Sequence, residues 1–494
     1  MPIWNSSQQN FSYDAITDKS RRKSPVNASK HESTILQQSD RRKLIATTQD
    51  QRRNLSLVAW AFRMHLSFTT QFTLHVTTED DGLNEAIEDA FDWYNRADNC
   101  DISGRHSLKR MMRLAEGHRF LDGDMGVIFS DTGKLQLVEG DRIAKPTSGF
   151  IPDEYKNIDW NQGAELNKYG GAEQYIICNR QDGGSTLAFD SVVSARAMRL
   201  YANLERIDQH RGVSPLAAAV NSFQDVYEAG ELNMMKAKAH ALFGVIIARE
   251  SSGRGELGIE QTADLTADAD DDTLYGEERY AVKPEGTFKM ELAPGESAST
   301  VESKTPSAEF LEFTKFFVQV SLLAFDLPMS FFDSRESSYA GQRMDLILYE
   351  FGNTQKRCQM QDMLSTITNW KLARWTSNNR DIRDDSEEPQ IKLPGKMRRQ
   401  DISYEWIPMG IPWIDPAKEM GADRDAISSA LQSRSYTAKK RGLPRLKRTM
   451  KELEKEEEEI RRRGITVIAG DPGSETINNI ESDETENDVQ TKAG

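Results

Sequence analysis

The stretch RIDQHRGVSPL, residues 206–216, divides the chain into two differently patterned parts. It ends with Ser214, a preferred N-cap residue, directly before Pro215, which is favoured at the first position of a helix. No further proline or cluster of helix-breaking residues follows until about Leu242. The pattern predicts one helix approaching 45 Å, at about 1.5 Å per residue. Gly212 and Val213 then form a tight turn into this helix, a structural role rather than a binding role.

Upstream of this stretch the sequence mixes helices with short strands. Residues 83–95 repeat apolar side chains about one helical turn apart, which predicts a helix. Residues 125–129 and 134–138 flank a turn at Asp131-Thr-Gly and read as strands. The expected fold class is therefore α+β.

Downstream, a small β-rich segment is expected between helices. Residues 245–248 read as a strand, residues 264–272 are rich in aspartate, and residues 293–296 predict a turn. A second helix is expected from Thr305-Pro306 to Phe325. It is apolar on most of its circumference, so it must be buried on several sides, in a core or against neighbouring subunits. A third long helix is expected from about Ser338 to Trp375, and Asp415-Pro416 opens helical segments to about Arg463.

Composition describes an acidic chain with no stretch apolar enough to span a membrane. The 494 residues carry 63 Lys and Arg against 78 Asp and Glu, a formal net charge of −15. Residues 1–54 are basic and predict a mobile arm, whereas residues 464–494 are acidic and predict a disordered tail. The usual basic DNA-binding module is disfavoured, and the N-terminus has no secretory pattern.

Catalytic, cofactor and metal-binding patterns are weak throughout. The three cysteines, Cys100, Cys178 and Cys358, are far apart and predict reduced thiols. Residues 253–258 match GxGxxG, but an acidic run follows where a phosphate-binding helix is needed. Residues 268–279 begin like a calcium loop, yet Thr273 and Arg279 replace the required glycine and glutamate. The expectation is a protein that is not an enzyme and has no cofactor or metal.

Five blocks, in order, resemble the lambda-type portal protein family of tailed bacteriophages. They are residues 51–54, residues 121–129 with 135–142, residues 206–216, residues 325–328 with 337–343, and residues 413–419. Asp124 departs from the family, which more often has glutamate there. The residues that carry the last three blocks are Arg206, Arg211, Gly212, Ser214, Pro215, Pro328, Tyr339, Arg343, Asp415 and Pro416.

The resemblance implies a portal-like subunit with an α/β wing and long stem helices. Its expected parts are a mobile basic arm (1–54), the wing (55–213), a stem helix (214–244), a β-rich clip (245–304), a second stem helix (305–327), a tunnel loop (328–338), a long tunnel helix with a return to the wing (339–415), helices of a C-terminal crown (416–463) and a disordered acidic tail (464–494).

The resemblance also implies a function. Such subunits form a ring, usually dodecameric, at one capsid vertex, and double-stranded DNA passes through it during packaging and ejection. Implied partners are the terminase large subunit, the major capsid and scaffold proteins and a head–tail adaptor, with no membrane. The implied location is the virion, with host cytoplasm during assembly. An acidic channel wall would repel the duplex and leave it free to move.

Two sets of residues follow from the resemblance as candidates. Arg335 is the loop cation able to touch phosphate, although Phe331 and Phe332 could instead pack under the long helix. The DNA-channel candidates in the tunnel loop are Met329, Ser330, Phe331, Phe332, Ser334, Arg335 and Glu336. The subunit-interface candidates are Phe310, Phe313, Phe316, Phe317 and Val320.

Two alternatives from other functional classes stay open. A monomeric helical adaptor or minor structural protein built around residues 416–463 would form no closed ring. A nucleotide-dependent enzyme would use residues 253–258 and bind a nucleotide tightly.

Overall fold

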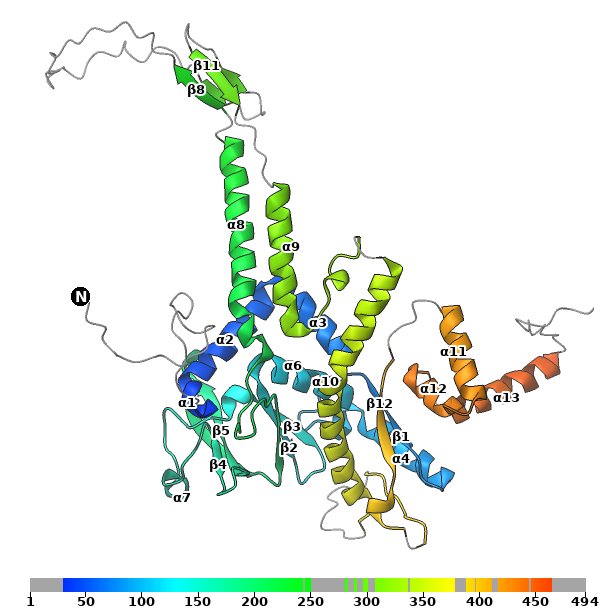
Figure 1. Ribbon diagram of the computed structural model, residues 1–494. Helices are drawn as coiled ribbons and strands as arrows, with labels where there is room; N and C mark the ends of the chain where they lie inside the picture. The colour runs from blue at the N-terminus through cyan, green and yellow to red at the C-terminus, as the bar shows by residue number, and fades with distance from the viewer. Residues whose placement is uncertain are drawn as a thin grey trace, which may run out of the picture. The chain divides into compact units, whose positions relative to one another are not determined.

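The computed structural model describes residues 30–242, 245–249, 280–282, 288–290, 296–300, 307–335, 338–377, 388–395, 397–410, 416–443 and 446–463. The chain divides into two compact units after Pro408, and each is described by itself. The first contains the strands and most helices (Figure 1). The GxGxxG stretch and the aspartate-rich run lie outside the described residues.

Helices of the first unit include two long stretches, as the sequence predicts. Ser214 accepts a hydrogen bond from the Leu216 amide and begins a 3-10 turn, which leads into α8. Ser338 caps α10 in the same way. The helices are α1 (Glu32–Ile35), α2 (Gln38–Asn54), α3 (Ser56–Thr69), α4 (Asp81–Tyr94), α5 (Ala97–Cys100), α6 (Leu108–Asp122), α7 (Asp153–Lys156), α8 (Val220–Leu242), α9 (Ala308–Leu322) and α10 (Tyr339–Trp375).

The strands form small antiparallel sheets. Two are three-stranded, in the orders β3-β2-β7 and β4-β5-β6, and the pairs are β1-β12, β8-β11 and β9-β10. The strands are β1 (Phe72–Val76), β2 (Asp124–Phe129), β3 (Leu135–Glu139), β4 (Ala164–Leu166), β5 (Ala172–Gln181), β6 (Thr186–Ser194), β7 (Met198–Ala202), β8 (Val245–Arg249), β9 (Tyr280–Val282), β10 (Phe288–Met290), β11 (Glu296–Thr300) and β12 (Tyr404–Pro408). The expected mixture of helices and strands is confirmed.

The two largest hydrophobic clusters of the first unit connect most of its helices. One packs α4, α6 and β2 against the C-terminal half of α10, with Trp375 fully buried. The other packs α3 and α6 against Phe223 of α8, Leu322 of α9 and Tyr349 of α10. α8 and α9 also lie side by side (Figure 1). The first residues of α8, the last turn of α9 and the N-terminal half of α10 therefore meet over one core.

The prediction of a mobile arm is wrong for residues 38–54. They form α2, whose apolar face buries Leu44 and Ile45. The basic residue Arg41 is also buried, because its guanidinium pairs with a buried carboxylate, Asp124. Residues 1–29 and the acidic tail 464–494 lie outside the described residues.

The described residues of the second unit form three helices, where the sequence predicts helical structure to about Arg463. They are α11 (Pro416–Ser428), α12 (Arg434–Lys440) and α13 (Leu446–Arg463). Arg441, just after α12, donates to Asp423 at 3.0 Å and to Glu419 at 3.2 Å on α11. In neither unit does a helix within the described ranges have the length and apolar character needed to cross a bilayer.

Candidate functional site

Asp124 is the centre of a buried ionic joint at the start of β2. Its carboxylate is fully buried and accepts from Arg41 at 2.6 Å and from the Arg211 Nε at 2.8 Å. The Gly212 amide donates to the same carboxylate at 2.8 Å. Burial alone would raise the pKa of Asp124, but Arg211 and Arg41 hold it below its usual value. The ionic joint therefore connects α2, β2 and residues 206–216 through contacts to one carboxylate.

Gly212 is required by a close approach of two chain segments. A Cβ at this position would lie 2.0 Å from the Gly123 carbonyl oxygen. Gly123 itself has a φ of 92°, in the region that favours glycine. Two glycines are therefore needed where these segments meet, because a side chain at either position would collide with the other backbone.

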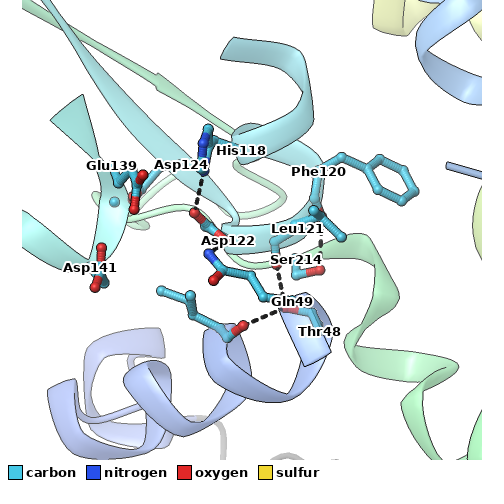
Figure 2. A network of polar contacts seen from close by, with 12 residues as sticks. Thr48, Gln49, His118, Phe120, Leu121, Asp122, Asp124, Glu139, Asp141 and Ser214 are labelled. Carbon is cyan, nitrogen blue, oxygen red and sulfur yellow. Dashed lines mark hydrogen bonds and ion pairs between the residues drawn. The ribbon is translucent and has the colours of Figure 1, made fainter. Parts of the chain in front are cut away.

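The C-terminal end of α6 is capped by side chains from two other segments (Figure 2). Ser214 donates to the Phe120 carbonyl at 2.8 Å and Thr48 donates to the Leu121 carbonyl at 2.9 Å. Asp122, which ends the helix, accepts from Gln49 at 2.8 Å and lies 2.7 Å from His118. The last carbonyls of a helix have no partner within it, so α2 and Ser214 satisfy groups that burial would otherwise leave unpaired.

Arg206 ties the start of the same stretch to residues near α1. Its guanidinium donates to the Lys30 carbonyl at 2.8 Å and pairs with Glu32 at 3.3 Å. The block that sequence reasoning singled out thus acts structurally. Arg41 and Asp124 were not among the expected site residues.

The loop between α9 and α10 is anchored to the helices beneath it. Asp326, in a left-handed conformation with a φ of 57°, pairs with Lys356 of α10 at 2.6 Å. The Phe331 ring lies 5.1 Å from Tyr349 and 6.0 Å from Phe68. Met329 packs against the same cluster. For Phe331 the structure supports the packing alternative, and Met329 is likewise partly buried.

The far end of the loop faces solvent in the single chain. Ser334 and Arg335 are exposed, and Phe332 is half-exposed with its ring 6.0 Å from Trp60. Arg335 donates two hydrogen bonds to Asp333, at 2.8 and 2.7 Å. Asp333 also lies 4.0 Å from Lys315 of α9. Ser330 is partly buried, and Glu336 lies outside the described residues.

α9 is buried on one side within the chain, not on several. Val318 and Leu322 are buried, and Phe310 and Phe317 are half-buried. Phe313, Phe316 and Val320, on the other side, are 53%, 60% and 37% exposed. These interface candidates are therefore available for a contact outside the chain.

The remaining residues of the family-like blocks lie at the ends of helices. Pro328 precedes a 3-10 turn at Met329–Phe331, and Tyr339 begins α10. Arg343 is exposed in the first turns of α10. Pro416 begins α11, whereas Asp415 lies outside the described residues.

Sequence reasoning missed a second exposed apolar surface, on α10. Met344, Ile347, Leu348 and Phe351 are all exposed. Their spacing of three and four residues could have revealed one helical face. Among the described residues there is no group of His, Cys, Asp and Glu side chains that could hold a metal.

Comparison with known proteins gives a family match over most of the chain. The family described as "Phage portal protein, lambda family" matches residues 19–355. A relative named "Probable portal protein" from Halomonas phage phiHAP-1 is 22% identical over 385 residues, covering 74% of this chain and 68% of the relative.

Among solved structures, a chain from the virion of a native gene transfer agent particle is 14% identical, with a TM-score of 0.41, covering 82% of this chain and 94% of that one. An HK97-family phage portal protein from Corynebacterium diphtheriae is 10% identical, with a TM-score of 0.30, covering 76% and 98%.

Proposed function

Since the chain belongs to the lambda family of phage portal proteins, we propose that it forms a closed dodecameric ring through which double-stranded DNA enters and leaves the phage head. The family match covers the chain from residue 19, before α1, to residue 355, within α10. The role is structural rather than catalytic. In this assignment residues 55–213 form the wing, α8 and α9 the stem, and residues 245–304 the clip.

The observation that carries the ring is the outward apolar side of α9. Phe316 is 60% exposed, although it lies in the middle of a helix whose opposite side packs in the core. Isolated exposed apolar residues need no explanation, but several on one helical face indicate a protein interface. A closed ring buries such a face on every subunit.

The exposed end of the 326–335 loop is the DNA-facing element of this proposal. Ser334, Arg335 and the exposed part of Phe332 are its contact residues. Arg335 is paired with Asp333, whose pKa the Arg335 side chain lowers by hydrogen bonding, so the loop presents a balanced pair of charges. With a chain charge of −15, weak contact with phosphates fits a channel through which DNA must move.

The proposed location is the portal vertex of the virion, after assembly in the host cytoplasm. There the clip would serve as the docking platform for the terminase large subunit and the head–tail adaptor. Capsid and scaffold proteins would contact the outer part of the ring.

Negative-stain electron microscopy with light-scattering mass tests the ring. Annular particles with a central hole and the mass of a dodecamer are the expected result. A monomer that capsid and scaffold proteins also fail to convert into rings would contradict the proposal and favour the monomeric adaptor.

A further inference from the structure

α9 carries a continuous apolar stripe on the side opposite its packed face. The packed face consists of Val318, Ser321 and Leu322, which are all buried. Residues three, four and seven apart share one side of a helix, which places four exposed side chains in one row. They are Phe313, Phe316, Val320 and Leu323, at the end of α9 and the start of the following turn, and they are 37% to 64% exposed.

The N-terminal half of α10 has the same arrangement. Tyr349 and Asn353 are buried and define its packed face. The opposite side carries Met344, Ile347, Leu348 and Phe351, which are 54% to 81% exposed. Cys358, also exposed, continues the row two turns further on. The two stripes have similar lengths, about 15 Å on α9 and about 20 Å on α10 when Cys358 is included, at about 1.5 Å per residue.

We propose that the α9 stripe of one subunit packs against the α10 stripe of the next subunit in the ring. The proposal rests on the ring assigned above and names the two surfaces that close it. In a cyclic ring each contact is heterologous, so every subunit must present two different complementary patches. The chain presents two apolar stripes on different helices, and the described residues of the same chain leave each of them uncovered.

Charges beside the stripes complement each other. Glu309 and Glu312 are exposed along the N-terminal part of the α9 stripe, and Arg343 is exposed beside the first residue of the α10 stripe. Within the described part of the chain, none of these three side chains forms a hydrogen bond or ion pair. Opposite charges around an apolar centre orient partners and exclude wrong ones, so Arg343 of one copy has acidic partners on its neighbour.

Two variants that each damage one stripe test this pairing. F316E places a charge in the α9 stripe, and I347E places one in the α10 stripe. Each variant alone lacks one half of every contact, so each is expected to be monomeric by light scattering while circular dichroism shows an unchanged fold. An equimolar mixture combines the intact α9 stripe of I347E with the intact α10 stripe of F316E. It is therefore expected to give a particle with the mass of two chains.

The outcomes separate this pairing from the ring itself. A mixture that stays monomeric, or a single variant that forms full-size rings, would overturn the pairing. Rings formed by the wild-type protein would still support the proposed function in that case. Wild-type protein that forms no ring under any assembly condition would contradict the proposed function itself.

Native Cys358 provides a second, direct measurement on assembled rings. It is the exposed cysteine, whereas Cys100 and Cys178 are buried. With Arg343 beside Glu309 and Glu312 of the neighbour, Cys358 lies near the C-terminal end of the neighbour's α9 stripe, so a second thiol there, in L323C or Q319C, is expected to be joined to Cys358 by a short bis-maleimide. Because each subunit links to the next, denaturing gels would show a ladder beyond the dimer. The control rings, Q319C with C358S and the wing variant K168C, should give no ladder. Intact L323C and Q319C rings that both give none would contradict the pairing.

Discussion

At the scale of single residues, Asp124 decides whether three segments can meet. Asparagine at position 124 has nearly the same shape as aspartate but no charge. It would leave the buried residues Arg41 and Arg211 without the carboxylate that they share. Breaking a buried ion pair by removing one partner typically costs about 3–5 kcal/mol. We expect D124N to lower the free energy of unfolding by this amount in urea titrations. The exposed D131N variant is the matched control, and an equal effect of both would contradict the role of the joint.

Lys371 of α10 is a second buried charge, and it makes stability depend on pH. Its ammonium group is fully buried, donates to the Gly133 carbonyl at 3.0 Å and pairs with Glu388 at 2.9 Å. Burial lowers the pKa of Lys371 to about 8, against about 10.4 for an unfolded lysine. Between these values the unfolded chain holds a proton that the folded chain has released.

The stability of the folded state should therefore rise with pH across this window. The contribution of Lys371 is about 3 kcal/mol between pH 8 and 10.4. K371M removes the titrating group, and Arg374 still lies 3.5 Å from Glu388. We expect the difference in unfolding free energy between wild type and K371M, measured in urea at several pH values, to change across this window. A difference that is constant from pH 7.5 to 10.5 would rule out a depressed pKa.

At the scale of elements, apolar periodicity predicted the helices and strands correctly. Composition was a poorer guide to which segments are folded. The helix over residues 83–95, the strands on either side of Asp131 and the cap at Ser214 are confirmed. Residues 1–54 were judged by their basic composition, and α2 contains only two large apolar side chains, Leu44 and Ile45. Apolar spacing could not reveal that α2 is packed, because three of its five buried residues, Arg41, Thr48 and Gln51, are polar or charged.

Two N-terminal truncations test whether α2 stabilises the fold and whether the residues before it do not. Removing residues 1–29 leaves every described contact of α2 in place, so the unfolding midpoint should stay unchanged. Removing residues 1–54 takes away Arg41, the Thr48 and Gln49 contacts to the end of α6 and the buried side chains of Leu44 and Ile45. Those two side chains alone contribute roughly 3–6 kcal/mol. We expect the longer truncation to be insoluble, and a soluble, cooperatively unfolding product would contradict the importance of α2.

The loop between α9 and α10 permits a test of charge balance. Asp333 pairs with Arg335 and lies beside Lys315, so D333N removes one negative charge next to two cations of the loop region. We expect assembled D333N rings to hold duplex DNA more tightly, with a salt slope steeper by about 0.9 for each new phosphate contact. R335Q with D333N is the control and should return binding to the wild-type value. Unchanged binding by D333N would contradict a DNA-facing loop.

At the scale of the whole molecule, the order of five short blocks was enough to predict the family. It could not predict how the blocks act, because their partners are distant in the sequence. Asp124 meets Arg41 across 83 residues and Arg211 across 87. The exposed side of α10 was missed for a related reason, since exposure depends on which side the rest of the chain covers.

The net charge of the whole chain predicts how tightly the assembled ring binds duplex DNA and how this binding depends on salt. Tight binding to a duplex comes mainly from counterion release by Lys and Arg, and it weakens as salt rises. A subunit of net charge −15 repels phosphates over distances that grow as salt falls. Wild-type rings should therefore bind duplex DNA weakly, and lowering the salt from about 200 to 50 mM should not strengthen binding. Fluorescence anisotropy with a labelled duplex measures this binding.

A steep rise in affinity at low salt would mean that a basic surface holds the DNA. Repeating the titration without residues 1–29, which carry Lys19, Arg21, Arg22 and Lys23, would then show whether that surface is the basic end of the chain or the channel itself.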